Sequence, residues 1–490
     1  MGGFFGIVSD MDCVRELFYG TDYHSHLGNL RGGMMTMGIN GIRRVIHDIS
    51  SSPFRPKFRE DLPYLEGATS GIGCISDTGD QPLIIRSHLG TYGVTMVGAI
   101  NNLNELTDQI CQDKNAHFSE IGTEGINPNE VAAAIVASGE TLAEGIVKLQ
   151  NTIEGSCSML ILAEEGIYAV RDGLGRTPVF VGRNNHAQVV AFEPCALYNL
   201  GYTKAYELKP GEAVLVTKDS ITQIVKPRSK MQICAFLWVY YGFPASSYEG
   251  KTVETVRYAC GEMLAKADAG IQWGNKPDMV VGIPDSGVAH ALGYAHGSDI
   301  PYKRAFIKYT PTWARSFIPK EQSKRAHVAS MKLLPVEELI KDKNLVFCED
   351  SIVRGTQLGN TMDRLRKLGV NEVHVRSACP PILFNCKYIN FSRSQGLSGL
   401  AARRAIARIE NHTLTGNVKE DDQWFNETPL DDYLDPTTEK YKLMIEEIRK
   451  ELNLTSVSYQ TLDDLIAAIG LPKECICTYC WDGCDVSKPE

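Results

Sequence analysis

The sequence predicts a mixed fold, α+β in its first part and α/β in its second. Two observations support this prediction. Short apolar runs separated by glycine and polar turns dominate the chain up to about residue 228, and strand-like runs alternate with helical patterns beyond it. The length of 490 residues is sufficient for two or three domains, each with its own hydrophobic core.

The first part contains six short runs with the length and β-branched content typical of strands in antiparallel sheets. These runs are 94–100, 157–162, 167–170, 178–181, 189–192 and 213–216. Helical patterns at 130–138 and 141–149 interrupt them. We therefore expect sheets layered with helices.

Polar residues 218–230 mark the expected junction with the second part. Beyond it we expect strands at 279–283, 345–348 and 373–375. Helices are expected at 288–295 and in the segment that ends at Leu368 and Gly369. Strands that alternate with helices indicate a parallel sheet with crossover connections.

The end of the chain is expected to be mainly helical. One helix, 440–452, has apolar residues at a one-face spacing: Tyr441, Met444, Ile445 and Ile448. A second, shorter helix begins at Thr461, where Asp464 completes a capping-box pattern. Gly470 and Pro472 predict its end, just before a group of cysteines.

Composition excludes several classes of function. The chain has 50 Lys and Arg against 59 Asp and Glu, a net charge of −9, so nothing drives it generally towards nucleic acid. No stretch approaches the roughly 18 apolar residues of a membrane span. The N-terminus lacks a signal-peptide pattern, and Gly6 stands where a myristoylation signal has Ser or Thr. We expect a cytoplasmic protein without nucleic-acid or membrane partners.

The 14 cysteines fall into two groups. Most are scattered singly among apolar residues, where small buried side chains are the expected role. Four lie close together near the end of the chain: Cys475, Cys477, Cys480 and Cys484. In a cytoplasmic protein such crowding indicates metal or cluster ligation more than packing or disulfides.

The most informative motif is residues 346–356, where an apolar strand ends in Glu349 and Asp350 before a short loop with Gly355. Amide groups in such a loop, at the start of a helix, suit a bound phosphate. The two acids can accept hydrogen bonds from sugar hydroxyls or hold Mg²⁺. An ordinary strand-to-helix turn with a solvated acid pair is the alternative.

This motif resembles the signature of type I phosphoribosyltransferases, which use 5-phosphoribosyl-1-pyrophosphate (PRPP). It is most similar to the form found in the glutamine PRPP amidotransferase family. Residues 282–287, 293–295 and 300–302 resemble that family's pyrophosphate loop and the following helix, although a plain strand–helix turn is the alternative there. Together the two loops would hold opposite ends of PRPP at the carboxyl edge of one parallel sheet.

The resemblance implies a role for each matching residue. Glu349 and Asp350 are the expected catalytic acids, which would hold the ribose or, together with Ser286, Mg²⁺. The pyrophosphate would be bound by Asp285, Ser286 and Gly287. The 5-phosphate would be bound by Ser351, Ile352, Val353, Arg354, Gly355 and Thr356. The family usually has Asp at the position of Glu349, and the extra methylene alters the expected metal geometry.

Residues 308–318, continuing to Lys324 and Arg325, resemble the family's flexible basic loop, which closes over PRPP. Lys308 and Arg315 are its predicted catalytic residues. The attraction between the cations of such a loop and two bound phosphates strengthens when water leaves the site. A solvated charged loop is the alternative, and the spacing from Lys308 to Phe317 is slightly longer than the family pattern.

Some members of the family carry a structural [4Fe–4S] cluster. The matching cysteines here are Cys234, Cys386, Cys477 and Cys480. Four thiolates suit such a cluster, Zn²⁺ is the nearest alternative, and free thiols are the third possibility. Cys475 and Cys484 have no role in this pattern.

The first part resembles the family's N-terminal-nucleophile glutaminase, but its chemical positions differ. The family's nucleophile is a cysteine that follows Met1 and uses its own α-amino group as base. Here that position is Gly2, and Cys13 lies too far along to inherit the amine. Ser76 replaces the arginine that anchors the glutamine carboxylate, and Ile100 and Asn101 replace the oxyanion-hole residues.

Residues 171–178 keep a structural turn of that fold. We therefore predict a four-layer αββα glutaminase-like domain (1–228) that folds without hydrolysing glutamine. A type I phosphoribosyltransferase domain (229–430) and a helical tail with the cysteine group (431–490), packed on that domain, are expected to follow.

The predicted activity is the formation of 5-phosphoribosylamine from PRPP and ammonia in purine nucleotide biosynthesis. Two alternatives stay open: a non-catalytic PRPP- or nucleotide-binding regulator, and a phosphoribosyltransferase with another amine or base as acceptor. The resemblance also implies inhibition by purine nucleotides and a homo-oligomer, a dimer or tetramer.

Overall fold

The computed structural model describes residues 2–39, 41–112, 117–122, 125–309, 333–389 and 396–485. These residues form two compact units. The first contains the described chain up to Cys234, joined by residues 387–389 from later in the sequence. The second contains Ala235–Cys386 and residues 396–485.

Two antiparallel sheets form the centre of the first unit. The seven-stranded sheet has the order β13-β11-β12-β1-β4-β2-β3, and the six-stranded sheet has the order β15-β14-β10-β9-β6-β5. The first sheet consists of β1 (Gly2–Ser9), β2 (Arg31–Gly38), β3 (Gly41–Asp48), β4 (Ala68–Ser76), β11 (Phe180–Arg183), β12 (Ala187–Ala191) and β13 (Thr203–Glu207). The second consists of β5 (Leu83–Ser87), β6 (Gly90–Ile100), β9 (Gly155–Ala163), β10 (Gly166–Val170), β14 (Ala213–Val216) and β15 (Ile221–Val225).

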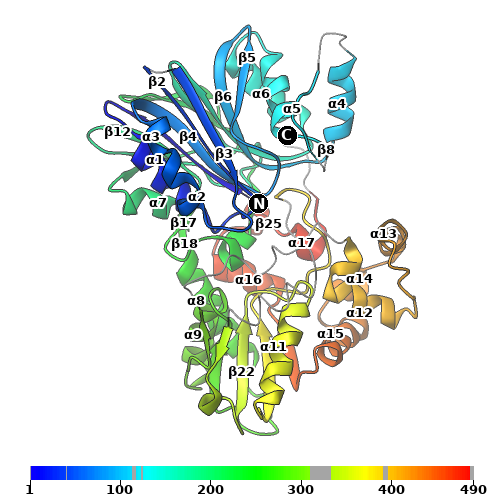
Figure 1. Ribbon diagram of the computed structural model, residues 1–490. Helices are drawn as coiled ribbons and strands as arrows, with labels where there is room; N and C mark the ends of the chain where they lie inside the picture. Colours follow the sequence, from blue (N-terminus) through cyan, green and yellow to red (C-terminus); the bar gives the residue numbers. More distant parts are fainter. Residues whose placement is uncertain are drawn as a thin grey trace. The chain divides into compact units, whose positions relative to one another are not determined.

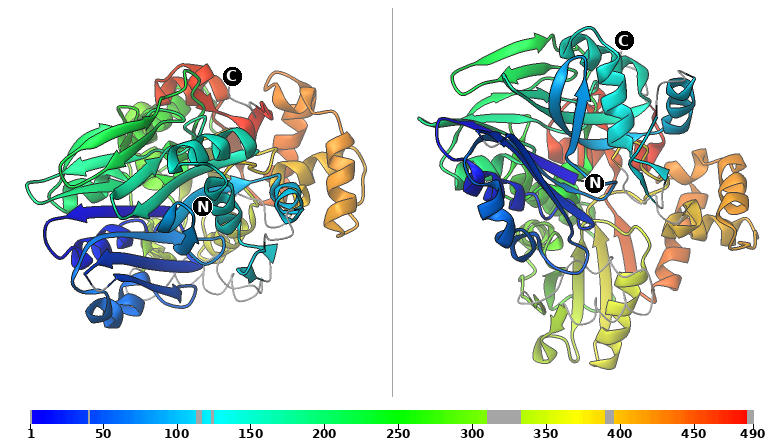
Figure 2. Two further views of the ribbon diagram at one scale, coloured as in Figure 1. Left: turned by 90° about the horizontal axis from the view of Figure 1, so that it is seen from above. Right: turned by 45° about the horizontal axis from the view of Figure 1, so that its top comes forward.

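Helices cover the outer face of each sheet, so this unit has the predicted four layers. α1 packs on β1 and β4, and α5 packs on β5 and β6 (Figure 2). The helices of the first layer are α1 (Val14–Asp22), α2 (Phe54–Phe58), α3 (Leu62–Leu65) and α7 (Pro194–Asn199). Those of the fourth are α4 (Leu103–Cys111), α5 (Pro128–Ala137) and α6 (Leu142–Thr152).

The two sheets approach each other closely where β1 has a glycine. A Cβ atom on Gly6 would lie 3.2 Å from Leu160 Cδ1 of β9 and 3.0 Å from Ile167 Cδ1 of β10. Leu160 and Ile167 have no exposed surface. The missing side chain on β1 therefore leaves the space that these two branched side chains of the facing sheet fill.

The second unit contains a four-stranded sheet with the order β19-β22-β23-β24, and every neighbouring pair is parallel. Its strands are β19 (Met279–Gly282), β22 (Asn344–Glu349), β23 (Glu372–Ser377) and β24 (Ser456–Tyr459). α8 (Val253–Ala267) and α9 (Gly287–Ser298) pack together, and α9 also contacts β19 and β22. β19 and β22 are largely apolar, which is typical of parallel strands covered on both faces, whereas β23 alternates polar and apolar residues.

Helices from the later part of the chain complete this unit (Figure 1). They are α11 (Thr356–Lys367), α12 (Ala401–Ile409), α13 (Val418–Glu427), α14 (Asp431–Leu434), α15 (Glu439–Glu451), α16 (Leu462–Ile469) and α17 (Tyr479–Asp482). The remaining short strands are β7 (Ile121–Gly122), β8 (Gly125–Ile126), β16 (Ile233–Cys234), β17 (Ser247–Tyr248), β18 (Lys251–Thr252), β20 (Phe306–Lys308), β21 (Leu333–Pro335) and β25 (Ile476–Cys477).

The expected elements are present, with shifts of a few residues at their ends. The run that starts at residue 178 begins as a strand only at Phe180, because Pro178 has no N–H for the ladder. α16 begins and ends as its punctuation predicts: Thr461 Oγ1 accepts from Asp464 N at 3.1 Å, and Gly470 ends the helix with φ 72°. The remaining helices, α1–α4, α7, α8, α12–α14 and α17, were not among the elements expected by residue number.

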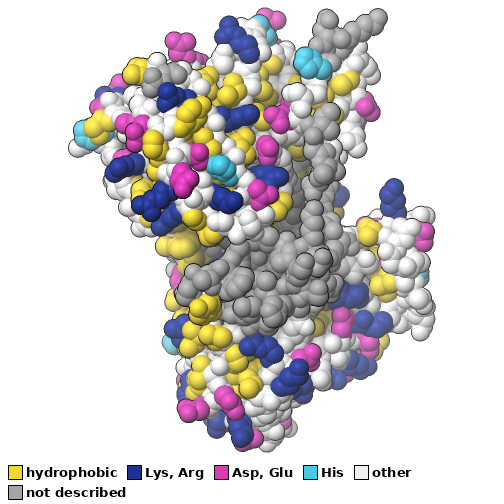
Figure 3. All heavy atoms as spheres, viewed as in Figure 1, with side chains coloured by type: hydrophobic (Ala, Val, Ile, Leu, Met, Phe, Trp, Pro, Cys, Tyr) yellow, Lys and Arg dark blue, Asp and Glu magenta, His cyan; other side chains and the backbone are white. Residues whose placement is uncertain are grey.

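The described residues include no helix long and apolar enough to cross a membrane. On the face shown in Figure 3, acidic and basic side chains of the described residues alternate and do not gather in one patch. This distribution agrees with the modest negative charge of the chain and favours no polyanionic partner for that face.

Leu160→Ala tests the packing between the two sheets. We expect the free energy of unfolding to fall by about 2–5 kcal/mol, because a fully buried leucine leaves a cavity when it is truncated. Chemical denaturation measures the change, and Val147→Ala on the exposed face of α6 is the matched control with a change under about 0.5 kcal/mol. Equal effects of the two substitutions would contradict this packing.

Candidate functional site

Two loops of the second unit meet at the carboxyl edge of its parallel sheet. β19 leads into residues 283–286 and then α9, while β22 leads into residues 350–355 and then α11. The parallel register of β19 and β22 pairs Gly282 with Cys348, so both loops start at the same level. Ser286 Oγ donates a hydrogen bond to Asp350 Oδ2, which joins the loops directly. This edge is where ligands of α/β sheets bind.

The acid pair at the end of β22 consists of the half-buried Glu349 and the buried Asp350. Asp350 is 4% exposed, and its Oδ1 accepts a hydrogen bond from Ser351 Oγ at 2.6 Å. Glu349 Oε2 is buried and has no hydrogen-bond partner among the described residues. Burial raises the pKa of both carboxyl groups, and the neighbouring Asp350 raises that of Glu349 further. A carboxylate oxygen without a partner leaves one strong acceptor for a cation or a hydroxyl.

A buried arginine on α8 balances part of this charge. Arg257 is 3% exposed and donates to the backbone carbonyls of Trp238 at 2.9 Å and Gly242 at 3.0 Å. Burial lowers the pKa of its guanidinium, and the charge of Asp350 opposes that shift. The sequence analysis did not identify Arg257. Its position among the buried residues of α8 is the signal that could have revealed it.

The loop between β22 and α11 presents backbone donors. None of the amide groups of Ser351, Ile352, Val353, Gly355 and Thr356 donates to an acceptor within the part of the chain that the structure describes. Gly355 has φ 72°, a left-handed conformation that glycine adopts without strain. Consecutive unpaired amides at a helix N-terminus form a site for an anion, and phosphate is the common occupant.

The loop after β19 matches the expected diphosphate site. Ser286 is the N-cap of α9, and Gly287 is its first residue. A Cβ atom on Gly287 would lie 2.5 Å from the carbonyl oxygen of Cys348, so only glycine fits between the two strand ends. Lys308, the last residue of β20, pairs with Asp285 Oδ2. The predicted residues Asp285, Ser286 and Lys308 are thus brought together, while Arg315 lies outside the described residues.

These groups fit Mg²⁺ and a phosphorylated sugar. The unpartnered Glu349 Oε2 and the Asp350 carboxylate are hard oxygen donors of the kind Mg²⁺ prefers, and Ser286 adds a hydroxyl. Among the residues that the structure describes, no group of three or more His, Cys, Asp or Glu side chains is arranged to hold a metal ion. The remaining oxygens around a magnesium ion would have to come from substrate and water.

The segments that carry the predicted cluster cysteines lie together in part. The amides of Leu383 and Phe384, just before Cys386, both donate to the carbonyl oxygen of Cys480, at 3.0 and 3.1 Å. The amide of Ala235, the residue after Cys234, donates to the carbonyl oxygen of Cys477 at 3.4 Å. Cys386 and Cys480 are buried. The structure shows no metal geometry for these thiols.

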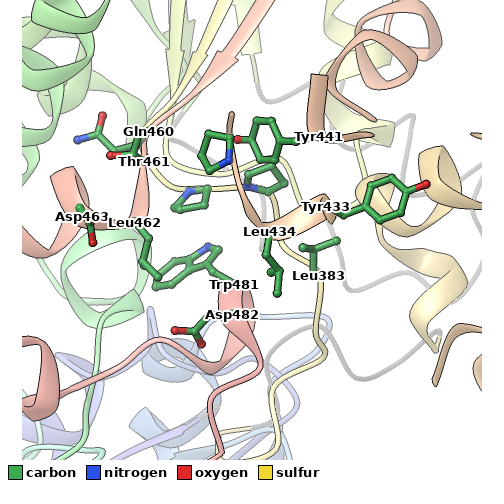
Figure 4. A pocket seen from close by; sticks show the side chains of 13 residues that line it. Leu383, Tyr433, Leu434, Tyr441, Gln460, Thr461, Leu462, Asp463, Trp481 and Asp482 are labelled. Atoms are coloured by element: carbon green, nitrogen blue, oxygen red, sulfur yellow. The ribbon is translucent and has the colours of Figure 1, made fainter. Parts of the chain in front are cut away.

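A small cavity lies beside these segments, beyond the carboxyl ends of β23 and β24. Its volume is about 200 Å³, and its walls include Pro380 and Pro381 after β23, Gln460 after β24, and Trp481 of α17. Figure 4 shows the indole nitrogen of Trp481 directed towards the cavity. The ring of Trp481 also stacks on Phe236, with centroids 4.9 Å apart. Trp481 therefore anchors α17 against the sheet edge.

The positions that correspond to the expected glutaminase residues lie in the first unit. Gly2 begins β1 and pairs in register with Ser76 at the end of β4. A Cβ atom on Gly2 would lie 2.6 Å from the carbonyl oxygen of Ile75. Ser76 Oγ donates to the carbonyl oxygen of Thr78 and accepts from Gln81 Nε2 at 3.0 Å. The hydroxyl is thus used within the fold.

Ile100 and Asn101 lie at the end of β6. Ile100 is 7% exposed and belongs to the core between the six-stranded sheet and its helices. The amide of Asn101 donates to the carbonyl oxygen of Glu154 at 2.7 Å. These two positions therefore serve the packing of β6 and its turn.

Comparison with known proteins finds relatives that match most of the chain. A family model described as a glutamine amidotransferase domain matches residues 70–199. Amidophosphoribosyltransferase 1 of Arabidopsis thaliana is 29% identical over 396 residues, which cover 79% of this chain and 68% of the plant protein. The amidophosphoribosyltransferase of Methanothermobacter thermautotrophicus is 26% identical over 478 residues, which cover 96% of this chain and 90% of its own. This chain is therefore similar to amidophosphoribosyltransferases over most of its length.

Solved structures show the same fold. The glutamine PRPP amidotransferase from B. subtilis, complexed with ADP and GMP, has a TM-score of 0.78 and 24% identity, and the match covers 100% of this chain and 98% of that one. A structure described as the allosteric regulatory enzyme of purine biosynthesis has a TM-score of 0.80 and 24% identity, covering 100% and 97% of the two chains. The expected order of a glutaminase-like fold followed by a phosphoribosyltransferase fold is confirmed.

The acid pair Glu349 and Asp350 makes stability depend on pH. Because the folded state raises the pKa of Glu349, it retains a proton that the unfolded chain releases above its ordinary pKa of 4.5. Stability therefore falls as the pH rises between these two values. Glu349→Gln removes this penalty, so we expect the variant to gain more free energy of unfolding over wild type at pH 8 than at pH 4.

Denaturant titrations in EDTA at the two pH values measure the gain, with the exposed Glu439→Gln as control. A gain for Glu349→Gln that is the same at both pH values would show that the carboxyl group ionises normally.

Proposed function

We propose that this protein forms 5-phosphoribosylamine from PRPP with free ammonia as the nitrogen donor, as a step of purine nucleotide biosynthesis. The observation that carries the proposal is the acid pair at the end of β22, in which Asp350 accepts a hydrogen bond from Ser286 and Glu349 Oε2 has no partner among the described residues. The loop that follows contains several amides without an acceptor in the described chain. The printed names of the relatives, which are amidophosphoribosyltransferases over most of this chain, support the reaction class.

In this proposal, each end of PRPP binds to one of the two loops at the carboxyl edge of the parallel sheet. The amides of residues 351–356 bind the 5-phosphate, and Asp350 and Glu349 accept hydrogen bonds from the ribose hydroxyls or hold Mg²⁺. The diphosphate lies at Ser286 and Gly287, where the start of α9 and Lys308 supply positive charge. Lys308 would exchange its present partner Asp285 for a diphosphate oxygen.

The proposed reaction is a substitution at C1 of the ribose. The nitrogen lone pair of ammonia forms a bond to C1 while the bond from C1 to the diphosphate oxygen breaks. Pyrophosphate leaves with the bonding electrons, and the new ammonium group then releases a proton to solvent. Bound Mg²⁺ would offset the charge that develops on the departing pyrophosphate. The chain contributes by fixing both phosphates, so that only the ribose carbon changes its bonding.

The choice of free ammonia as the nitrogen donor rests on two residues of the first unit, Gly2 and Ser76. Glycine at position 2 has no side chain to form an acyl-enzyme, and the adjoining Ile75 carbonyl occupies the place of a Cβ atom. Ser76 is held by Gln81 and Thr78 and carries no charge for a glutamine carboxylate. We infer that this unit does not release ammonia from glutamine.

A comparison of nitrogen donors tests the proposed function. With PRPP and Mg²⁺, ammonium should support pyrophosphate release, and glutamine at the same concentration should give less than about one hundredth of that rate, because a missing nucleophile costs several orders of magnitude. Gly2→Cys should not restore glutamine use, because its Cβ atom would collide with the Ile75 carbonyl.

Glutamine-dependent turnover by the wild-type protein would overturn the assignment of the donor. PRPP binding without pyrophosphate release from any donor would instead favour a regulatory role, and release only with other amines or bases would identify a different acceptor.

We also propose that Cys234, Cys386, Cys477 and Cys480 hold a structural [4Fe–4S] cluster, with Zn²⁺ as the alternative. The chemistry of the donor set supports this proposal, because four thiolates are the usual ligands of such a cluster. The backbone bonds from Leu383 and Phe384 to Cys480, and from Ala235 to Cys477, support it further. No catalytic step depends on the group.

Metal analysis of protein purified without oxygen tests this proposal. We expect a brown protein with about four iron and four sulfide ions per chain. Cys386→Ser should lose most of this iron and lower the melting temperature, whereas Cys484→Ser, at an exposed cysteine outside the pattern, should retain it. Zinc without sulfide would identify the alternative metal, and the absence of both metals would contradict the proposal.

We further propose that purine nucleotides inhibit this protein. The B. subtilis relative was solved with ADP and GMP, and a pocket for PRPP shares its ribose and phosphate groups with such nucleotides. We infer that they compete with PRPP. A homo-oligomer remains a prediction.

A further inference from the structure

The loop of residues 351–355 is held from outside by helices of the later part of the chain. The amide of Ala401, at the start of α12, donates to the carbonyl oxygen of Val353 at 2.9 Å. Arg404 Nη2, one turn further along α12, donates to the carbonyl oxygen of Arg354 at 2.7 Å. A Cβ atom on Gly355 would lie 2.9 Å from Leu452 Cδ2, just beyond α15. Three consecutive loop residues thus contact α12 or the end of α15.

These bonds determine which way the loop amides point. In a planar trans peptide, the C=O and the following N–H point in opposite directions. With the carbonyls of Val353 and Arg354 turned towards α12, the N–H groups of Arg354 and Gly355 are turned away from it. Two successive amides with the same direction form an anion-binding concavity. The contacts from α12 therefore orient the donors that the proposed 5-phosphate site needs.

Further hydrogen bonds hold the Arg404 guanidinium in this position. Its Nη1 donates to the carbonyl oxygen of Gly399 at 2.9 Å, and its Nε and Nη2 donate to Glu451 Oε1 on α15 at 3.1 and 2.7 Å. The guanidinium thus joins the loop, the turn before α12 and α15 in one plane. A lysine has a single ammonium group and cannot reproduce this fork.

We propose that Arg404 is a positioning residue for the 5-phosphate of PRPP, which it serves through the loop carbonyl of Arg354 and without touching the substrate. The proposal rests on the proposed function, because it takes PRPP as the ligand of the loop. Arg404 accordingly affects the phosphate end of the site and leaves the diphosphate end, at Ser286 and Gly287, unchanged. The amide of Ala401 adds a second contact that a side-chain substitution does not remove.

The same helix offers a matched control. Arg408, one turn after Arg404, also pairs with Glu451, from Nη2 to Oε2 at 2.6 Å, and with Glu447 Oε2 at 3.3 Å. In contrast to Arg404, it has no bond to the loop within the described chain. Arg408→Met therefore removes the two ion pairs that Arg408 makes with α15 and keeps the contact of Arg404 with the carbonyl oxygen of Arg354.

Calorimetry with three ligands tests the proposal on the full chain. We expect Arg404→Met to bind PRPP and ribose 5-phosphate about tenfold more weakly than wild type, the size of effect that loss of about one oriented hydrogen bond gives. Its affinity for pyrophosphate should stay within about twofold of wild type, and Arg408→Met should bind all three ligands within about twofold. Arg404→Lys should behave like Arg404→Met, because the charge alone does not hold the carbonyl.

The outcomes separate this proposal from the function on which it rests. If wild type binds neither PRPP nor ribose 5-phosphate, the proposed function fails. If wild type binds both and Arg404→Met binds them equally well, only the role of Arg404 is overturned. Weakening of all three ligands, or the same weakening in Arg408→Met, would show a general effect on stability and would also overturn it.

Discussion

Parallel pairing between β19 and β22 is the constraint on which the candidate site depends. Because the two strands run in the same direction, their carboxyl ends reach one edge, and the loops that follow them meet there. The bond from Ser286 to Asp350 and the close contact of Gly287 with the Cys348 carbonyl exist only in this register. A shift of one residue along either strand would separate the groups that belong to the two ends of one ligand.

The acid pair adds an unfavourable term that the surrounding fold offsets in part. Two carboxyl groups at adjacent positions lose hydration and repel each other. Hydroxyl donors from Ser286 and Ser351, and the buried charge of Arg257 on α8, reduce the cost at Asp350, while Glu349 keeps an oxygen without a partner. A carboxyl oxygen without a hydrogen-bond partner is typical of a binding site, because the ligand supplies the missing partner.

Much of this architecture could be predicted because local pattern and tertiary role agree. β14 coincides with its apolar run, and α16 follows from Thr461, Gly470 and Pro472. The motif from Glu349 to Thr356 located the loop because its chemistry is contiguous in sequence. Arg404 could not be found in this way, because its contact with the loop is to the carbonyl oxygen of Arg354, 50 residues away, and no local pattern reports such a contact. Helix α12 was missed because its buried Arg403 interrupts an apolar pattern.

The position of β24 has a consequence for folding during synthesis. This strand, Ser456–Tyr459, completes the sheet by pairing with β23, although it emerges from the ribosome long after its neighbour. Until then β23 presents an unpaired edge with an apolar core of Val373 and Val375, which is the type of surface that recruits foreign strands. This edge of the parallel sheet is therefore protected only after residues 456–459 have been synthesised.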